Sequence, residues 1–166
     1  MTNDIKIEKM HTAHWPAVLE IFKEGITGGN ATFTTTAPSW QQWDEGHLQS
    51  CRFVATLNDE VMGWIALSPF SSKDCHRGVV EDSIYISHKA QGLGIGSLLL
   101  KTCIEESEKE NIWLMQSQIF VENESSIYLH KKFGFYEVGV RQKIGKLNGV
   151  WRDVLLLDRR STIAGL

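Results

Sequence analysis

Hydrophobic residues alternate with polar ones, or run together in short blocks, in seven segments of this chain. Both patterns are typical of β-strands, because successive side chains point to opposite faces and a strand covered on both faces is hydrophobic throughout. Polar residues 58–60 predict a tight turn between the second and third segments, and residues 146–149 predict another between the last two. The seven predicted strands are residues 5–10, 51–57, 61–67, 79–86, 112–121, 135–144 and 150–157.

Four other segments have the pattern of helices: residues 12–28, 39–48, 97–110 and 123–133. Thr12, Ser39 and Asn123 are the predicted N-caps, and Gly28 and Gly134 the predicted ends of two of these helices. The resulting order of elements is neither a regular strand–helix alternation nor an all-β pattern. It predicts an α+β fold, with a sheet of mixed direction and helices on both faces.

The composition limits the class of protein. A chain of 166 residues fits a single domain over 1–166, with its core at about 5–158. The net charge of −3 gives no electrostatic surface for nucleic acid, and the 3 scattered Cys predict neither a metal site nor a disulfide framework. We find no signal peptide and no apolar run that would span a membrane, so we expect a cytoplasmic protein.

A glycine-rich turn, Gln91-Gly92-Leu93-Gly94-Ile95-Gly96-Ser97, joins the fourth strand to the third helix. Such a turn directs backbone N–H groups and a helix N-terminus at one point, as an anion site requires, and glycine leaves the backbone accessible. A nucleotide P-loop would need a Lys after Gly96, which this chain lacks. A dinucleotide-binding motif would need a third glycine and would follow the first strand, whereas this turn follows the fourth. A coenzyme A pyrophosphate loop and a turn without a ligand both fit these residues.

Two motifs show a resemblance to a known family. Gln91-x-x-Gly94-x-Gly96 is similar to the Q/R-x-x-G-x-G/A signature of the GNAT superfamily of acetyl-CoA-dependent N-acetyltransferases. Asn123 followed by residues 129–135, LHKKFGF, resembles a second segment of that superfamily. Residues 30–33, 77–86 and 149–154 resemble its phosphinothricin and methionine sulfoximine acetyltransferase group, and the similarity spans about residues 5–158. The chain departs from that group at Gly92 and Leu147, where a cationic residue is common.

The resemblance implies a GNAT-like fold with a mixed, largely antiparallel seven-stranded sheet. It implies a homodimer whose last hairpin, with Trp151 and Asp153, lies near the partner's site. It also implies acetyl-CoA as co-substrate and no metal. The residues implied to bind acetyl-CoA are Ile84, Tyr85, Ile86, Gln91, Gly92, Leu93, Gly94, Ile95, Gly96, Ser97 and Asn123.

Glu81 and Asp82 are adjacent carboxylates within a hydrophobic strand, so their side chains point to opposite faces. Taken alone, Glu81 is better explained by an ion pair with Arg77. The resemblance implies instead that Glu81 is the catalytic base, acting directly or through a water molecule. It implies that His130 is the acid that protonates the leaving thiolate, and a surface or capping histidine is the alternative. Tyr128 is a weaker candidate for this acid.

The resemblance implies that the acceptor is a small amino-acid-like molecule whose amino group attacks the thioester directly. Arg77 is the candidate for binding an anionic group, Glu81 contacts the amine, and Phe33 and Trp64 are candidates for an apolar wall. Another acceptor remains an alternative, such as a polyamine, an aminoglycoside or a protein N-terminus. A non-catalytic acyl-CoA-binding sensor is a further alternative.

Overall fold

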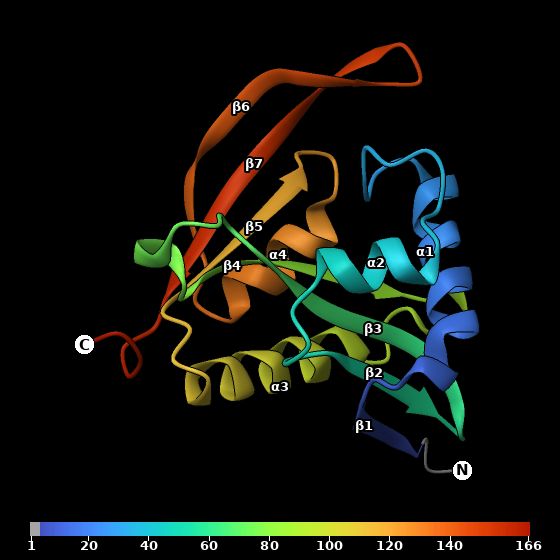
Figure 1. The fold of residues 1–166 in the computed structure, drawn as a ribbon. Coiled ribbons are helices and arrows are strands. Elements are labelled where there is room, and N and C mark those ends of the chain that lie inside the picture. Colours follow the sequence, from blue (N-terminus) through green and yellow to red (C-terminus); the bar gives the residue numbers. More distant parts are fainter. Residues whose placement is uncertain (1–3) are drawn as a thin grey trace.

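The computed structural model describes residues 4–166, which form a seven-stranded sheet in the order β1-β2-β3-β4-β5-β7-β6 (Figure 1). Every neighbouring pair of strands is antiparallel except β4 and β5, which are parallel. The predicted α+β fold with a mixed, largely antiparallel sheet is therefore confirmed. The strands are β1 (Ile5–Lys9), β2 (Phe53–Leu57), β3 (Glu60–Pro69), β4 (Val79–Ile86), β5 (Leu114–Phe120), β6 (Tyr136–Leu147) and β7 (Val150–Arg160).

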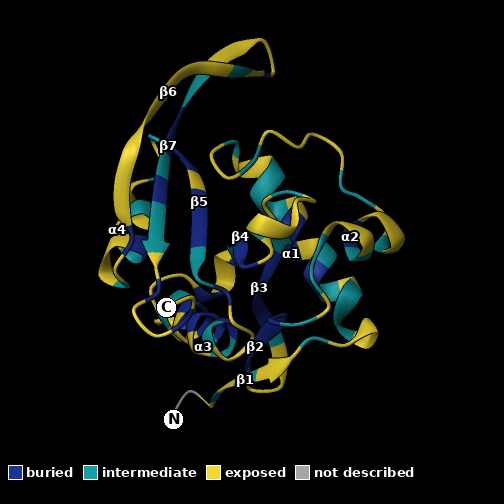
Figure 2. Ribbon diagram, turned by 60° about the vertical axis from the view of Figure 1, so that its left-hand side comes forward, coloured by how far each residue is buried: buried dark blue, intermediate teal, exposed yellow. Residues whose placement is uncertain are grey.

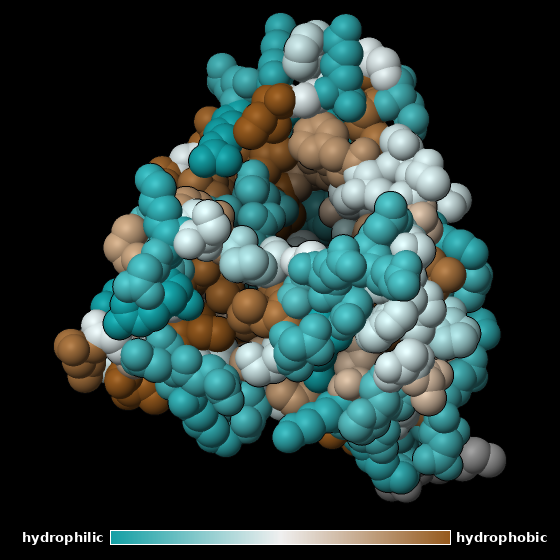
Figure 3. Space-filling view, in the orientation of Figure 1, coloured by the Kyte–Doolittle hydropathy of each residue, from teal (hydrophilic) through white to brown (hydrophobic). Residues whose placement is uncertain are grey.

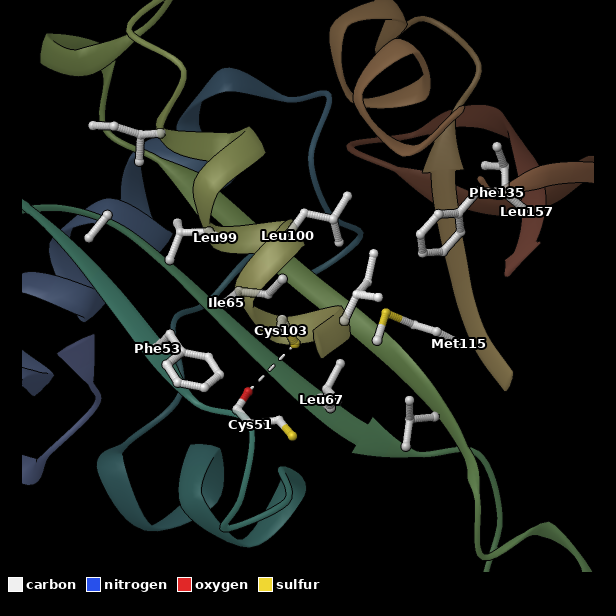
Figure 4. Close-up of a cluster of buried hydrophobic side chains, with 14 of the residues drawn as sticks. Cys51, Phe53, Ile65, Leu67, Leu99, Leu100, Cys103, Met115, Phe135 and Leu157 are labelled. Carbon is white, nitrogen blue, oxygen red and sulfur yellow. Dashed lines mark hydrogen bonds between the residues drawn. The ribbon is translucent and has the colours of Figure 1, made fainter. Parts of the chain in front are cut away.

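Helices cover both faces of this sheet, as expected. The helix α3 (Ile95–Lys109) packs against β2, β3 and β4 over a core that includes Leu99, Leu100 and Cys103 (Figure 4), and α4 (Glu124–Lys132) lies beside it. On the opposite face, α1 (Trp15–Gly28) and α2 (Trp40–Gly46) enclose a second core around Trp43 and Trp64. No helix within residues 4–166 is long and apolar enough to cross a membrane.

Local sequence sets most of the helix ends. The Ser39 hydroxyl accepts a hydrogen bond from the Gln42 N–H at 3.2 Å, and the Asn123 side chain accepts one from the Ser126 N–H at 3.3 Å. The prediction for Thr12 is wrong: residues 12–14 form a separate 3₁₀ turn and α1 begins at Trp15. An α-helix from Thr12 would need the N–H of residue 16 to bond the Thr12 carbonyl, and Pro16 has no N–H.

The two central strands separate along their length. β4 and β5 pair only from Val79–Leu114 to Glu81–Gln116. Beyond that point β4 stays paired with β3 as far as Ile86, and β5 stays paired with β7 as far as Phe120. The gap between them therefore leaves backbone groups of both strands without partners in the sheet, and it lies at the ends of the strands that lead into the glycine-rich turn and into α4.

The β6–β7 hairpin extends beyond the rest of the sheet (Figure 1). β7 pairs with β5 from Val154 onward, whereas residues 150–152 pair only with β6. Asn148 and Gly149 form the turn with φ of 48° and 82°, values typical of a two-residue hairpin turn. Figure 2 shows that almost all of β6 is exposed.

Candidate active site

Two adjoining cavities open at the gap between β4 and β5. The smaller one has a volume of about 270 Å³ and the larger about 610 Å³. Figure 3 shows the surface hollowed below the β6–β7 hairpin, beside the loop that follows α1. Because the two cavities share a boundary, a molecule bound in one can reach a molecule bound in the other. The residues that line both are Asn30, Ala31, Ile84, Tyr85, Asn123 and Ser126.

The glycine-rich turn forms one end of the larger cavity. Gly92 and Gly94 have φ of 75° and 80°, and a Cβ added to either would meet no atom within 4 Å. The space over the turn is thus open, and α3 begins at Ile95 with the unpaired N–H groups of its first turn. Backbone donors, a helix N-terminus and open space make this cradle suitable for a phosphate group.

The structure brings together nearly all the residues expected to bind the coenzyme. Ten of the eleven line the larger cavity, and Leu93 is exposed and does not. Within the turn, the Gln91 side-chain amide donates to the Ile86 carbonyl at 3.2 Å, so Gln91 ties the turn to the end of β4.

Glu81 lies in the smaller cavity, at the point where β4 and β5 separate. Its Oε2 accepts hydrogen bonds from the side-chain amides of Gln116 at 3.0 Å and Gln118 at 3.1 Å. The alternative ion pair with Arg77 is wrong, because the ion-pair partner of Arg77 is Asp74. Two fixed amide donors orient the Glu81 carboxylate, and Oε1 has no protein donor among residues 4–166.

His130 is buried between α4 and the two separating strands, so the alternative of a surface histidine is wrong. Its Nδ1 donates to the Ser126 carbonyl at 2.7 Å, which leaves Nε2 to contact Asp82 Oδ2 at 2.7 Å and Ser117 Oγ at 3.2 Å. Burial opposes a charge on the imidazole, but the attraction and hydrogen bond of Asp82 and the Ser126 carbonyl together raise the pKa of His130. Its protonated form is therefore favoured.

An apolar wall bounds the smaller cavity on the side of the β6–β7 hairpin. Phe33, from the loop after α1, packs edge-on against Phe120 with ring centroids 4.8 Å apart. Leu147 and Val154 are buried with Phe120. Leu147, where the chain differs from the family it resembles, therefore packs as part of this wall.

Arg152 connects the loop after α1 to the sheet. Its guanidinium lies 4.1 Å from the centre of the Phe120 ring and donates to the Gly29 carbonyl at 2.7 Å and to Asn30 Oδ1 at 2.6 Å. The Asn123 side-chain amide donates to the Asn30 carbonyl at 3.1 Å. The resemblance includes Arg152 in a matching segment, but no local signal in the sequence shows what it contacts.

Three candidate residues lie away from the smaller cavity. The Arg77 side chain is 63% exposed and lies over the Trp113 ring, 5.5 Å from its centre. Trp64 is buried in the core between α1 and the sheet, where it stacks on Tyr85, and Tyr128 is exposed on α4. Tyr85 itself borders both cavities, and burial raises its pKa to about 12, so its phenol stays protonated.

Comparison with known proteins shows which family has this fold and these motifs. The profile of the acetyltransferase (GNAT) family matches residues 15–135. The chain is similar to the L-methionine sulfoximine/L-methionine sulfone acetyltransferase of Pseudomonas paraeruginosa, with 26% identity over 152 residues that cover 88% of each chain.

Two solved structures have the same fold. The phosphinothricin acetyltransferase of Sinorhizobium meliloti in complex with acetyl-CoA is 27% identical, with a TM-score of 0.84 over 94% of this chain and 88% of that one. The ribosomal-protein-alanine N-acetyltransferase of Brucella melitensis is 28% identical, with a TM-score of 0.86 over 94% of this chain and 99% of that one.

Proposed function

This chain belongs to the acetyltransferase (GNAT) family and is an N-acetyltransferase, and on that premise we propose that it acetylates the amino group of a small amino-acid-like acceptor. The acceptor is of the phosphinothricin, methionine sulfoximine or methionine sulfone type, and the acetyl donor is acetyl-CoA. The observation that carries the proposal is the pair of adjoining cavities, with a phosphate cradle at the end of one and the oriented Glu81 carboxylate in the other.

The residues of the larger cavity fit acetyl-CoA, because the open cradle at Gly92 and Gly94 is suited to its pyrophosphate. The edge of β4 that faces the gap is not paired with β5 at residues 84–86, so it is available to the pantetheine arm. When bound, acetyl-CoA supplies an acetyl group activated as a thioester. This use of acetyl-CoA is also consistent with a cytoplasmic enzyme.

Three groups of the chain carry the proposed transfer. Glu81 accepts a proton from the acceptor's ammonium group, directly or through water, and so frees the amine to attack. A backbone N–H of β4 in the gap stabilises the negative charge that develops on the carbonyl oxygen. His130 donates a proton to the leaving thiolate. The transfer is direct and needs no covalent acyl-enzyme.

The smaller cavity supports a small acceptor. Its volume of about 270 Å³ suits a single amino acid better than an aminoglycoside. Phe33 and Phe120 form an apolar wall for the acceptor's methylene groups, and Glu81 and Gln118 provide polar contacts on another side. The named activities of the Pseudomonas and Sinorhizobium proteins agree with this size and chemistry.

A protein N-terminus is the second candidate acceptor, because the Brucella structure is similar over nearly the whole chain. Steady-state kinetics with acetyl-CoA decide between the two. The acceptors to compare are phosphinothricin, methionine sulfoximine, methionine sulfone, spermidine, an aminoglycoside and a peptide with N-terminal alanine. We expect the first three to give the highest kcat/KM and intersecting initial-velocity patterns. Turnover of the peptide alone would overturn the proposed acceptor, and parallel patterns would overturn direct transfer.

We also propose a homodimer that uses the β6–β7 hairpin. Exposed hydrophobic side chains concentrate on these strands, both along β6 and on the part of β7 that extends beyond β5. A surface of this kind is typical of a protein–protein interface. The exposed residues are Tyr136, Val138, Val140, Ile144, Val150 and Trp151.

A further inference from the structure

Asp82 is a buried carboxylate for which the transfer described above has no use. It follows Glu81 in β4, but its side chain points to the opposite face of the sheet, toward α4. The side chains of Asp82 and His130 are each only 1% exposed, and Asp82 Oδ2 lies 2.7 Å from His130 Nε2. Both residues line the smaller cavity.

The position of this pair links it to the reaction. Glu81 and Gln116 are the last paired residues of β4 and β5, so Asp82 and Ser117 are the first residues beyond that pairing. Both of them contact His130 Nε2. The imidazole is therefore held where the two strands begin to separate, next to the gap in which the thioester would lie.

The contacts of Asp82 are unusual for an ion pair that only stabilises the fold. Its Oδ1 is buried and has no hydrogen-bond partner among the described residues. A buried ion pair overcomes the loss of hydration only when its remaining lone pairs are satisfied, so one left incomplete is weak evidence for stability. Buried unsatisfied polar atoms of this kind occur at catalytic sites.

We propose that Asp82 is a positioning residue for the acetyl transfer, one that orients His130 and keeps it protonated beside the gap between β4 and β5. This inference rests on the proposed function, because it assigns His130 the task of donating the proton. In this role Asp82 acts only through its contact with His130.

The proton balance is as follows. The amine, which has given one proton to Glu81, forms the C–N bond, and the nitrogen loses its second proton through Glu81 once the first has passed to water. As the C–S bond breaks, its electron pair goes to sulfur, and His130 transfers the Nε2 proton to that sulfur to give the free thiol. The imidazole is then neutral and keeps its Nδ1 proton, which the Ser126 carbonyl holds. Asp82 neither gives nor takes a proton in this step. Nε2 now faces the Asp82 carboxylate without a proton, an unfavourable contact between two acceptors, so His130 readily takes a proton from the medium.

Asp82 dominates the charge environment of His130. On β4, Tyr85 is protonated because burial raises its pKa, and on α3 burial raises the pKa of Cys103, so both are neutral. Ser117 on β5 is neutral, and Phe135 presents the edge of its ring to the imidazole. Within residues 4–166, no other cation lies within ion-pair distance of Asp82. Removing the charge of Asp82 therefore removes the attraction that keeps His130 protonated.

The test compares Asp82→Asn, which keeps the shape but removes the charge, with the wild type. The first measurement is an NMR titration of the His130 imidazole in the coenzyme-free protein, in which a His130→Gln spectrum identifies its signal among the 6 histidines. We expect the His130 pKa to fall in Asp82→Asn. The second is the pH profile of kcat: Asp82→Asn should lower kcat about tenfold or more, within the range of acid–base catalysis, and move the alkaline decline to lower pH.

A matched control shows that these changes come from the site. Glu108→Gln removes a carboxylate from a partly buried ion pair with Arg159 (3.0 Å) that joins the far end of α3 to β7. It should lower the melting temperature without moving the pH profile or the His130 signal. The double variant Asp82→Asn/His130→Gln should be no slower than His130→Gln alone, since the two residues act as a unit.

An unchanged His130 titration in Asp82→Asn would overturn the inference, and so would an unchanged pH profile. The titration needs no acceptor and no coenzyme, so it stands even if the proposed acceptor is wrong. Failure of the proposed function would give a different result: the wild type would turn over none of the acceptors. If Asp82→Asn does not fold, Asp82→Ser, which is smaller and uncharged, takes its place.

Discussion

Glu81 and Asp82 are neighbours in sequence, but the strand places them on opposite faces of the sheet with different partners. Glu81 meets two neutral amides from β5, and Asp82 meets the imidazole of His130 from α4. The two carboxylates thus lie at the same point along the gap, but their side chains are on opposite faces and have different environments. This arrangement gives the proposed base and the proposed acid separate positions at the gap in which the thioester would lie.

Glu81→Gln should lower kcat by about 100-fold or more, the size expected for loss of a general base. The amide is nearly isosteric but cannot accept the ammonium proton. The Kd of acetyl-CoA, measured by calorimetry, should stay nearly unchanged because Glu81 lies in the other cavity. Glu20→Gln, at an exposed carboxylate of α1, is the control and should keep full activity. Comparable kcat values for the two variants would exclude Glu81 as the base.

Only one of the 3 cysteines should react with a thiol reagent in the folded protein at pH 8. Cys75 is exposed, whereas Cys51 and Cys103 are buried. Burial raises the pKa of Cys51 to about 11 and raises that of Cys103 as well, so their reactive thiolates are scarce at this pH. A colorimetric thiol assay should count one thiol per folded chain and three after denaturation, and Cys75→Ser should remove the first. Loss of activity in Cys75→Ser would contradict direct transfer.

At the scale of elements, two connections form the site: the glycine-rich turn before α3 and the loop after α1. Residues of the turn line the larger cavity, so their backbone N–H groups can serve a phosphate there without a cationic side chain. The loop needs hydrogen bonds from other parts of the chain to hold it in place, because residues 30–36 belong to no helix or strand. Arg152 on β7 and Asn123 at the start of α4 donate those hydrogen bonds.

Gly94→Ala should weaken acetyl-CoA binding about fivefold. Alanine at a φ of 80° is strained by about 1 kcal/mol, and relief of the strain moves the N–H groups of the turn. Gly149→Ala is the matched control: it has a φ of 82° and equally open surroundings, but lies in the β6–β7 turn. Calorimetric titration with acetyl-CoA should separate the two variants, and equal affinities would rule out the turn as the phosphate cradle.

Arg152→Ala should raise the KM of the acceptor about tenfold, the effect of losing hydrogen bonds to a charged group. The KM of acetyl-CoA should change less, since Arg152 lines neither cavity and acts through the loop that carries Phe33. Arg160→Ala is the control, because Arg160 also donates to several backbone carbonyls but near the C-terminus of the chain. An acceptor KM that is the same in both variants would show that the hydrogen bonds from Arg152 to the loop do not shape the acceptor site.

For the whole molecule, the separation of β4 from β5 and the long β6–β7 hairpin have the largest consequences. The gap places a strand edge inside the protein, where a ligand can reach its backbone groups, while both strands stay paired on their other sides. The hairpin carries exposed hydrophobic residues past the end of the sheet, and nothing within residues 4–166 covers them.

Trp151→Glu should convert the proposed dimer to a monomer. Trp151 is 53% exposed, and its ring lies 4.9 Å from Lys146 Nζ. A carboxylate buried between two hairpins would be costly without a partner. Sedimentation velocity at micromolar concentration measures the change, and Ile163→Glu, at a more exposed hydrophobic residue near the C-terminus, is the control. A wild type that sediments as a monomer would refute the dimer.

The sequence by itself determined the local elements. Alternation and short hydrophobic blocks predict all seven strands, and the caps at Ser39 and Asn123 lie where expected, because these features depend on neighbouring residues. The glycine-rich turn also precedes a helix as expected, although α3 begins at Ile95, two residues before its predicted start. The resemblance to the GNAT family could be seen from the glycine-rich turn and the LHKKFGF segment for the same reason. The opposite orientation of Glu81 and Asp82 follows from the pleat of a strand alone.

Only the tertiary structure decided which distant side chains meet. Asp82 and His130 are 48 residues apart, and Arg152 and Gly29 are 123 apart. The position of Arg77 away from the cavity is likewise a result of packing against Trp113. Periodicity fixes the face on which a residue lies, but the register between strands and the packing of helices fix its partner. The site depends on those partners, so the sequence could predict the chemistry but not the contacts that arrange it.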